Sequence, residues 1–538
     1  MSERKNTFFG GAAVLAVGAI VVKLIGALYK IPLANILGDT ANGYFNSAYT
    51  IYSVLLTIST GGLPCALSKQ ISEAHALGRV NQKKRIFFVS LFALVACGLF
   101  SLFVMLFGAE FITANILGNP GAHCATMVLS PAALFVCCMS ALRGYTQGQS
   151  IMTPTAISQI LEAICKLVFG LSLAYAFLML GSSMTDVFTP LELSASGAIA
   201  GVSIGTFVAF TFLVLDFIHR IKQSNEVGHD VPQPRHRVLI DLFKLAIPIT
   251  LGASVVPIVN FLDTMQVQNR LQEVFQITSD AASALYGTYS AATNLYSLPS
   301  SLMVPFTASL VPAISAARAR RDYLGATRIT ESAMRVAMLV ACPMGFGLTS
   351  LATPIVTLLY GRKYDVSIMG PILAVLGIVS ICTCIVVLSN SIMQASGYVN
   401  LPVIIMVIGG VLKLIVNYVL VGMESVGIQG APYGTLACFG SAALLDLIMI
   451  HKTLPNKPNY RRIFFKPVLA SLIMAFAAWA SHGLLFRILD SNSIATVGAI
   501  VIAVLVYAIL VVALRAISPD DLEMMPKGEK IAKLLRIR

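Results

Sequence analysis

The chain has 538 residues, of which 57% are hydrophobic and 11% are charged, and its formal net charge is +13. Soluble domains carry about 25% charged residues, so this composition excludes an ordinary soluble protein and indicates that most of the chain lies in lipid. The positive charge does not indicate a nucleic-acid partner, because basic and non-basic connections alternate along the chain, as the positive-inside rule requires.

Apolar runs long enough to cross a bilayer, which takes about 20 residues, recur along the whole chain. They predict an all-α polytopic membrane protein with about fourteen transmembrane helices. The first run is too long for a signal peptide, so we expect it to be retained. The predicted spans are 9–37, 43–67, 86–109, 122–146, 155–180, 194–219, 239–267, 282–316, 328–352, 366–394, 400–422, 427–450, 466–488 and 494–516.

The connections predict how the spans are oriented. Lys and Arg are concentrated in every second connection, which marks the cytoplasmic side of the membrane. With an even number of spans, both termini lie on that side, and the basic tail is expected to form a short amphipathic helix on the membrane surface. No connection is long enough for a soluble catalytic domain.

Short motifs recur in the same order in two halves of the chain. The sequence LPCALS at Leu63–Ser68 corresponds to VPAIS at Val311–Ser315, and CKLV at 165–168 corresponds to LKLI at 412–415. Six spans in each copy predict two six-helix lobes related by a pseudo-two-fold axis along the membrane normal, with a central cavity between them. The predicted domains are an N-lobe at 1–220, a cytoplasmic linker at 221–238, a C-lobe at 239–452, two added helices at 453–516 and a cytoplasmic basic tail at 517–538.

Two lysines lie inside the first predicted span. Lys23 and Lys30 are seven residues apart, close to two helical turns, so they share one face of the helix. An ionised side chain at bilayer depth is costly and is by default a candidate functional residue. These lysines therefore predict a water-filled cavity that binds an anion. For Lys30, which is nearer the outer end, reaching the membrane interface is the alternative.

The repeat pairs two further lysines, Lys166 in the fifth span and Lys413 in the eleventh. Glu162 precedes Lys166 by four residues, the favourable orientation for a helical ion pair. Lys166 is thus expected either to face the cavity or to neutralise Glu162, whereas Lys413 has no acid within one turn. Lys69, at the inner end of the second span, is expected at the mouth of the cavity, where Glu73 is a possible partner.

The acids at depth predict either ion coupling or charge pairing. Asp263 in the seventh span is expected to bind a coupling cation or to pair with a lysine of the other lobe. Asp216 and Asp446, near the ends of their spans, are expected at the membrane interface. No P-loop, HExxH or GxSxG pattern is present, and the cysteines and histidines lack metal-ligand spacing. We therefore expect no enzyme activity, catalytic residue, cofactor or metal, and transport driven by an ion gradient, the membrane potential or substrate supply.

Four segments resemble the MOP (multidrug/oligosaccharidyl-lipid/polysaccharide) exporter superfamily. They are KLIGALYKIPLANILG at Lys23–Gly38, GLPCALSKQISE at Gly62–Glu73, FLDTMQVQNRL at Phe261–Leu271 and SLVPAISAA at Ser309–Ala317. Within the superfamily, the chain resembles the branch that contains the stage V sporulation protein B family and the Gram-positive MurJ-type lipid II flippases.

The resemblance implies a V-shaped, two-lobed flippase that moves an undecaprenyl-diphosphate-linked glycan outward by alternating access. In such proteins, basic residues of the first span face the central cavity, and Lys23 and Lys30 occupy those places, while Lys69 matches a basic residue of the second span. Arginine is common there, and lysine cannot make the same bidentate contact with a diphosphate.

The expected substrate is lipid II, which would place the chain in peptidoglycan synthesis, cell wall biogenesis and cell shape. Teichoic acid, capsule or spore wall precursors are alternatives within the same class, and a sporulation role remains open. A MATE-like cation or drug antiporter is a second class, but it needs acids in the cavity, and the first span contains none. A membrane scaffold without transport activity is a third class, which the deep charges and the repeat disfavour.

Overall fold

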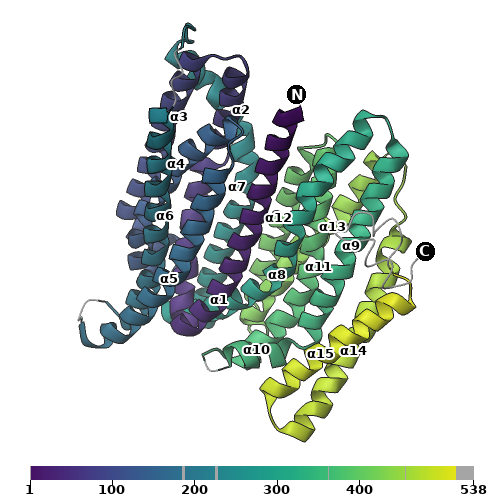
Figure 1. The fold of residues 1–538 in the computed structure, drawn as a ribbon. Helices are drawn as coiled ribbons and strands as arrows, with labels where there is room; N and C mark the ends of the chain where they lie inside the picture. The colour runs from purple at the N-terminus through teal and green to yellow at the C-terminus, as the bar shows by residue number, and fades with distance from the viewer. Residues whose placement is uncertain (1, 185–187, 224–227, 362, 455, 517–538) are drawn as a thin grey trace. The chain divides into compact units, whose positions relative to one another are not determined.

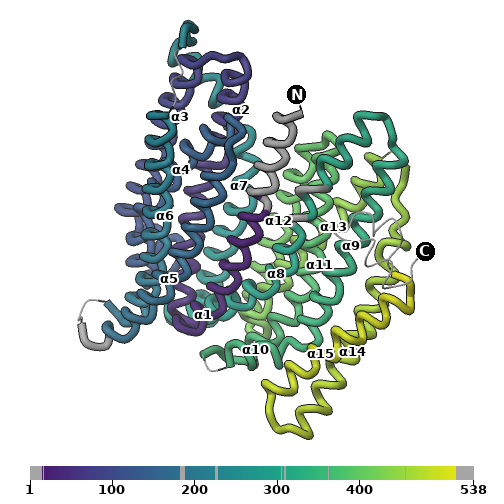
Figure 2. The backbone as a smooth tube through the Cα atoms, viewed as in Figure 1, coloured from purple at the N-terminus to yellow at the C-terminus, as the bar shows by residue number. Residues whose placement is uncertain are grey.

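The computed structural model describes residues 2–184, 188–223, 228–361, 363–454 and 456–516, and these are helical with no β-strand among them (Figures 1 and 2). The chain forms two compact units, Met1–Gly287 and Thr288–Arg538. The predicted helix in the tail 517–538 lies outside the described residues.

The N-terminal unit contains seven helices and the start of an eighth, drawn from purple to teal in Figure 1. They are α1 (Ser2–Thr60), α2 (Leu63–Ala76), α3 (Val80–Phe107), α4 (His123–Gly148), α5 (Thr153–Met184), α6 (Pro190–Gln223), α7 (Arg235–Phe275) and the first turns of α8 (Ser279–Ala319), with a π-helical turn η1 (Phe111–Ile116) and a 3-10 turn η2 (Pro120–Ala122).

The C-terminal unit continues α8 and adds the helices drawn from green to yellow in Figure 1. They are α9 (Tyr323–Ser350), α10 (Ala352–Tyr360), α11 (Val366–Ala395), α12 (Leu401–Val421), the 3-10 turn η3 (Gly427–Gly430), α13 (Ala431–Thr453), α14 (Tyr460–Leu489) and α15 (Asn492–Ala513). The last two form a hairpin in the region where the sequence predicts two added helices.

The helices account for the predicted membrane spans. Twelve stretches of the described residues are long and apolar enough to cross a membrane. The first of them, Val17–Ala76, contains two predicted spans, because α1 continues through the predicted connection between them. The predicted span 282–316 lies in α8, which is additional to the twelve. The chain is therefore an all-α polytopic membrane protein.

A glycine allows α1 to change direction without ending. Gly38 has φ 73° and ψ −170°, a backbone conformation outside the helical region that residues with a Cβ rarely adopt. Tyr29 lies before this kink and Tyr49 lies after it. The two parts of α1 consequently carry different side chains to the same region of the N-terminal unit.

Polar contacts attach the start of α8 to α1. The first turns of α8 therefore belong to the first compact unit. Tyr44 Oη donates to Asp280 Oδ1 at 2.8 Å, and Asn42 Nδ2 donates to the carbonyl oxygen of Gly287 at 2.8 Å. The contact boundary at Gly287 thus falls later than the predicted linker 221–238. The pseudo-two-fold relation between the two sets of six spans remains a prediction.

Small residues allow close helix packing inside the N-terminal unit, as is usual in membrane bundles. A Cβ atom added to Gly201 of α6 would collide with the backbone of Gly170 in α5. The resulting close approach of α5 and α6 positions one face of α5 against α1. That face carries Lys166.

Candidate functional site

Lys166 lies against two tyrosines of α1. Its ammonium group is 5.2 Å from the ring centroid of Tyr29 and 4.8 Å from that of Tyr49, and Nζ donates to Tyr49 Oη at 3.4 Å. Contacts of an ammonium group with the faces of aromatic rings contribute about 0.5–1 kcal/mol when exposed and about 2 kcal/mol when desolvated. The two rings therefore make a favourable contact with the Lys166 ammonium group without supplying a counter-ion.

The packing of Tyr29 depends on a glycine one turn after Lys166. A Cβ atom at Gly170 would lie 2.9 Å from both Cε2 and Oη of Tyr29. Tyr29 is 3% exposed, and its hydroxyl oxygen is buried with no hydrogen-bond partner in the described part of the chain. Glycine is thus required here for space, and the hydroxyl of Tyr29 is buried without a hydrogen-bond partner among the described residues.

A second lysine lies close to Lys166. Lys30 follows Tyr29 in α1, its side chain is exposed, and its ammonium group repels that of Lys166 electrostatically. Among the described residues, neither lysine is paired with an acid. Two neighbouring positive charges without a counter-ion form a site that an anion would stabilise. We refer to Lys30, Lys166, Tyr29 and Tyr49 as the lysine–tyrosine cluster.

Glu162 is not the partner of Lys166. Its Oε2 accepts from Arg143 Nη2 of α4 at 3.2 Å, and the two side chains are 31% and 14% exposed, respectively. Arg143 Nε also donates to Ser158 Oγ at 3.0 Å. Of the two predicted arrangements for Lys166, pairing with Glu162 is therefore wrong, because Glu162 pairs with Arg143 of the preceding helix.

Lys23 and Lys69 lie elsewhere in the N-terminal unit. Lys23 is exposed on the same straight part of α1 as Lys30. Lys69 is exposed on α2 and lines a cavity of about 420 Å³ together with Glu73, Asp241 and Lys244. No ion pair joins Lys69 to Glu73 within the described residues, so the predicted pair does not form.

Asp263 is 5% exposed in α7, within the N-terminal unit. The neighbouring Thr264 hydroxyl lies 2.7 Å from Tyr286 Oη, and Gln268 Nε2 donates to Ser47 Oγ at 2.8 Å. This half of α7 therefore has a polar interface with α1 and α8. Asp263 belongs to the same compact unit as the lysine–tyrosine cluster.

In the C-terminal unit, Lys413 is 5% exposed in α12. Close packing with α13 accompanies this burial, since a Cβ at Gly434 would collide with the Asn417 side chain and would lie 3.1 Å from the Lys413 carbonyl oxygen. Lys413 is thus a buried residue of its own unit, unlike the exposed Lys30.

The two acids predicted at the membrane interface differ from each other. Asp216 accepts from Arg220 Nε at 2.6 Å, one turn away on α6. Asp446, by contrast, is fully buried in α13, and neither carboxylate oxygen has a hydrogen-bond partner in the described structure. Neighbouring helices therefore cover this face of α13, and the interfacial depth of Asp446 stays a prediction.

Sequence reasoning missed three residues of this region. Tyr29 and Tyr49 are unremarkable aromatic residues in an apolar helix, and Arg143 follows the expected pattern of a cytoplasmic basic residue. The adjacency of Tyr29 to Lys30 is the one local signal. The described residues contain no group of three or more His, Cys, Asp or Glu side chains that could hold a metal ion.

Comparison with known proteins gives sequence relatives along most of the chain. The lipid II flippase MurJ of Bacillus subtilis (strain 168) is 25% identical over 463 residues, which is 82% of this chain and 82% of the relative. Stage V sporulation protein B of the same organism is 24% identical over 534 residues, which is 97% of this chain and 98% of the relative.

Two solved structures have a similar fold. A lipid II flippase MurJ in an inward closed conformation matches with a TM-score of 0.69 and 16% identity, covering 93% of this chain and 98% of that one. An inward-facing MATE family multidrug resistance transporter of the MOP superfamily matches with a TM-score of 0.65 and 14% identity, covering 81% and 97%.

The family model described as polysaccharide biosynthesis protein matches residues 8–318, which is more than half of the chain. This region includes every helix that contributes to the lysine–tyrosine cluster. The chain belongs to the polysaccharide biosynthesis protein family.

Proposed function

We propose that this protein is a flippase that moves an undecaprenyl-diphosphate-linked cell wall glycan precursor from the inner to the outer leaflet of a bacterial cell membrane. Lipid II is the first candidate substrate, and alternating access is the proposed mechanism. The single observation that supports this most is the lysine–tyrosine cluster. In it Lys166 contacts two tyrosine rings of α1, and neither Lys166 nor Lys30 has an acid partner among the described residues.

A diphosphate has the chemistry that this cluster lacks. Its negative charge would offset the repulsion between Lys30 and Lys166. Its oxygens could accept hydrogen bonds from both ammonium groups and from the buried Tyr29 hydroxyl. Lysine binds phosphate as a compact point charge with rotatable donors, so this recognition doesn't require the fixed geometry of a guanidinium group.

The class of lipid-linked anionic glycan is favoured over a cationic drug. A cation site needs an available carboxylate, whereas Glu162, the acid nearest the cluster in sequence, is already neutralised by Arg143. The names of the relatives agree with the proposal, since one of them is a lipid II flippase. Teichoic acid, capsule and spore wall precursors share the diphosphate and remain alternatives within it.

Coupling and orientation are part of the same proposal. Asp263 is our candidate for binding a monovalent coupling cation or for charge pairing during the cycle, with the membrane potential as the other driving force. We propose that both termini are cytoplasmic and that Lys23 and Lys69 contact the substrate on its way to the cluster. Lys413 would act as a buried counterpart in the other unit.

The test is a translocation assay on protein reconstituted in liposomes, with labelled lipid II, other undecaprenyl-linked glycans and a cationic dye as separate substrates. A hydrogen bond to a charged group contributes about 1.5 kcal/mol, and each variant would lose one such contact. We therefore expect Lys30→Met and Lys166→Met each to reduce glycan translocation by about tenfold. Lys166→Arg should retain part of the activity. Lys457→Met, at an exposed position of the C-terminal unit, is the matched control.

Two results would contradict the proposal. One is export of the cationic dye with no movement of any lipid-linked glycan. The other is normal translocation by both lysine variants at wild-type protein levels in the membrane.

A further inference from the structure

A groove of about 950 Å³ lies in the N-terminal unit, between the start of α3, the segment 228–234 and the start of α7. Its lining includes four basic side chains, Lys84, Arg85, Arg235 and His236, and it contains no acid. Lys84, Arg235 and His236 are exposed. The groove is therefore positively charged, and it differs from the cavity that Lys69 lines, where acids and bases alternate.

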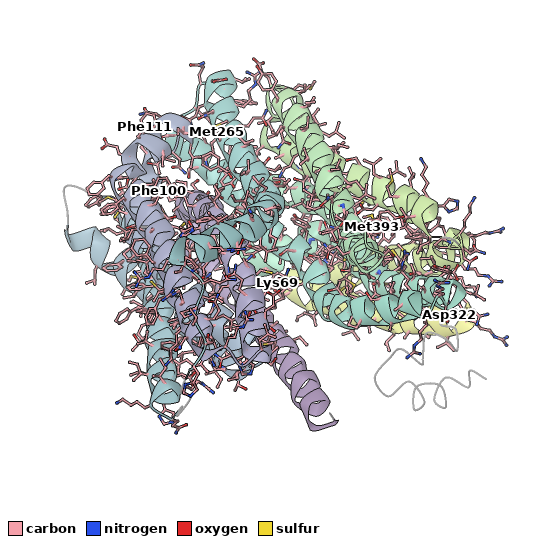
Figure 3. All side chains as sticks on the ribbon, turned by 90° about the horizontal axis from the view of Figure 1, so that it is seen from above. Lys69, Phe100, Phe111, Met265, Asp322 and Met393 are labelled. Atoms are coloured by element: carbon pink, nitrogen blue, oxygen red, sulfur yellow. The ribbon has the colours of Figure 1, made fainter. Side chains whose placement is uncertain are left out.

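The opposite end of the groove is apolar and continues along α3. Phe88 and Phe92 line it and are 64% and 77% exposed. Phe100, Phe103 and Phe107 follow on the same helix, with exposed fractions of 62%, 51% and 76%. Spacings of three, four and eight residues keep these rings on one side of the helix. Figure 3 shows Phe100 well apart from Lys69 on this unit.

Hydrogen bonds fix the segment before α7 against the start of α3, where both line the groove. Asp230 accepts from the backbone N–H groups of Asn81 and Gln82 at 2.8 Å each, and so caps the first turn of α3. Arg85 Nη1 donates to the carbonyl oxygen of Gln233 at 2.9 Å. These contacts attach the segment before α7 to α3 and present the basic side chains from two directions.

The start of α7 adds to the attraction for an anion. Arg235 and His236 are the first residues of this 41-residue helix, where unsatisfied backbone N–H groups and the helix dipole favour negative charge. Bound anions at such positions are common in proteins. Here the helix start and the basic side chains act on the same groove.

We propose that this groove binds an anionic phospholipid of the cytoplasmic leaflet, with its phosphate against Lys84, Arg85 and Arg235 and an acyl chain along Phe88 and Phe92. Basic pockets beside membrane-crossing helices on the cytoplasmic side are suited to anionic headgroups. A soluble phosphate would use the basic end and leave the exposed phenylalanines unused, so the continuity of charge and apolar surface favours the lipid. The bound lipid would join α3 to α7 across the segment between them.

The experiment measures lipid retention by the purified full-length protein in detergent, using native mass spectrometry with added phosphatidylglycerol or phosphatidylcholine. Each basic residue near an anionic lipid surface makes a favourable contribution to the binding free energy. Removing two of them should weaken phosphatidylglycerol binding by about 30-fold. The variant is Lys84→Gln with Arg235→Gln. The matched control is Lys452→Gln with Lys457→Gln, two exposed basic residues of another connection.

Two further arms separate the lipid from a free anion and from a folding defect. Phe88→Ser with Phe92→Ser leaves every charge in place and should still reduce phosphatidylglycerol binding. Inorganic phosphate should not displace the lipid from the wild-type protein. Thermal unfolding of each variant without added lipid shows whether it folds. Equal retention by the basic variant and its control, equal binding of both lipids, or full displacement by phosphate would overturn the proposal.

Discussion

The Lys166 ammonium nitrogen lies 3.4 Å from the hydroxyl oxygen of Tyr49 and 4.8 Å from the centroid of its ring. A lysine within a membrane-crossing helix is usually expected to pair with an acid. Here an aromatic side chain takes that place, so the positive charge is accommodated without being cancelled. This difference is the basis for our proposal that the residue binds an anionic ligand.

Substitution of Tyr49 separates the contribution of its ring from that of its hydroxyl. Tyr49→Phe keeps the ring beside Lys166, so translocation of a lipid-linked glycan should change little. Tyr49→Leu removes the ring. The lost contact between the ring and the Lys166 ammonium group contributes about 0.5–2 kcal/mol, so translocation should fall by about 2- to 30-fold. Equal activity of the two variants in the liposome assay would show that the ring does not matter.

The pair of Arg143 and Glu162 can be tested with a double-mutant cycle. Breaking a partly buried ion pair leaves one polar group without its partner, so Arg143→Met and Glu162→Gln should each destabilise the protein by about 1–3 kcal/mol. The double variant should lose less than the sum of the two, as read from apparent melting temperatures in detergent. Combining Glu162→Gln with Lys166→Met is the control, and strong coupling in that cycle would contradict the observed pairing.

Gly170 is a test of the close packing behind the cluster. Gly170→Ala adds a methyl group where Tyr29 leaves no room, and overpacking of this kind costs about 1–3 kcal/mol. The matched control is Gly440→Ala in α13, where a Cβ would meet nothing within 4 Å. That substitution should stabilise its helix by about 0.5–1 kcal/mol. Melting temperatures that rise for both variants would show that Tyr29 can move aside.

Substitution of Asp446 is expected to stabilise the protein, which is unusual for a buried position. Its buried carboxylate has no hydrogen-bond partner in the described structure, so Asp446→Leu removes a polar group that pays a desolvation penalty of about 1–3 kcal/mol. The apparent melting temperature should rise. Asp216→Leu is the control and should lower the apparent melting temperature, because the Asp216 carboxylate accepts a hydrogen bond from Arg220 Nε at 2.6 Å. A fall in melting temperature for Asp446→Leu would indicate a partner for its carboxylate.

Several features follow from local properties of the chain. The apolar runs from 9–37 to 494–516 identify the membrane-crossing segments, and the motif at Lys23–Gly38 carries the resemblance to polysaccharide exporters. Both depend only on residues that are neighbours in sequence. The fold match to solved MOP superfamily structures agrees with them.

The partners of the charged residues were less predictable. Glu162 and Lys166 are four apart on one helix, yet Glu162 pairs with Arg143, 19 residues away on α4, and Lys166 reaches Tyr49 at a separation of 117 residues. Asp446 lies near the end of its predicted span and is nevertheless fully buried. Sequence spacing cannot rank such partners, because it does not contain the distances between helices.

The sequence by itself determined the class of protein, the positions of its apolar spans and the presence of lysines within them, because hydropathy and charge act residue by residue along the chain. Only the tertiary structure decided that Glu162 pairs with Arg143 and that Lys166 lies against an aromatic ring instead. That choice depends on how closely the helices approach one another. In this unit, Gly170 and Gly201 permit the approach that sets Lys166 against α1.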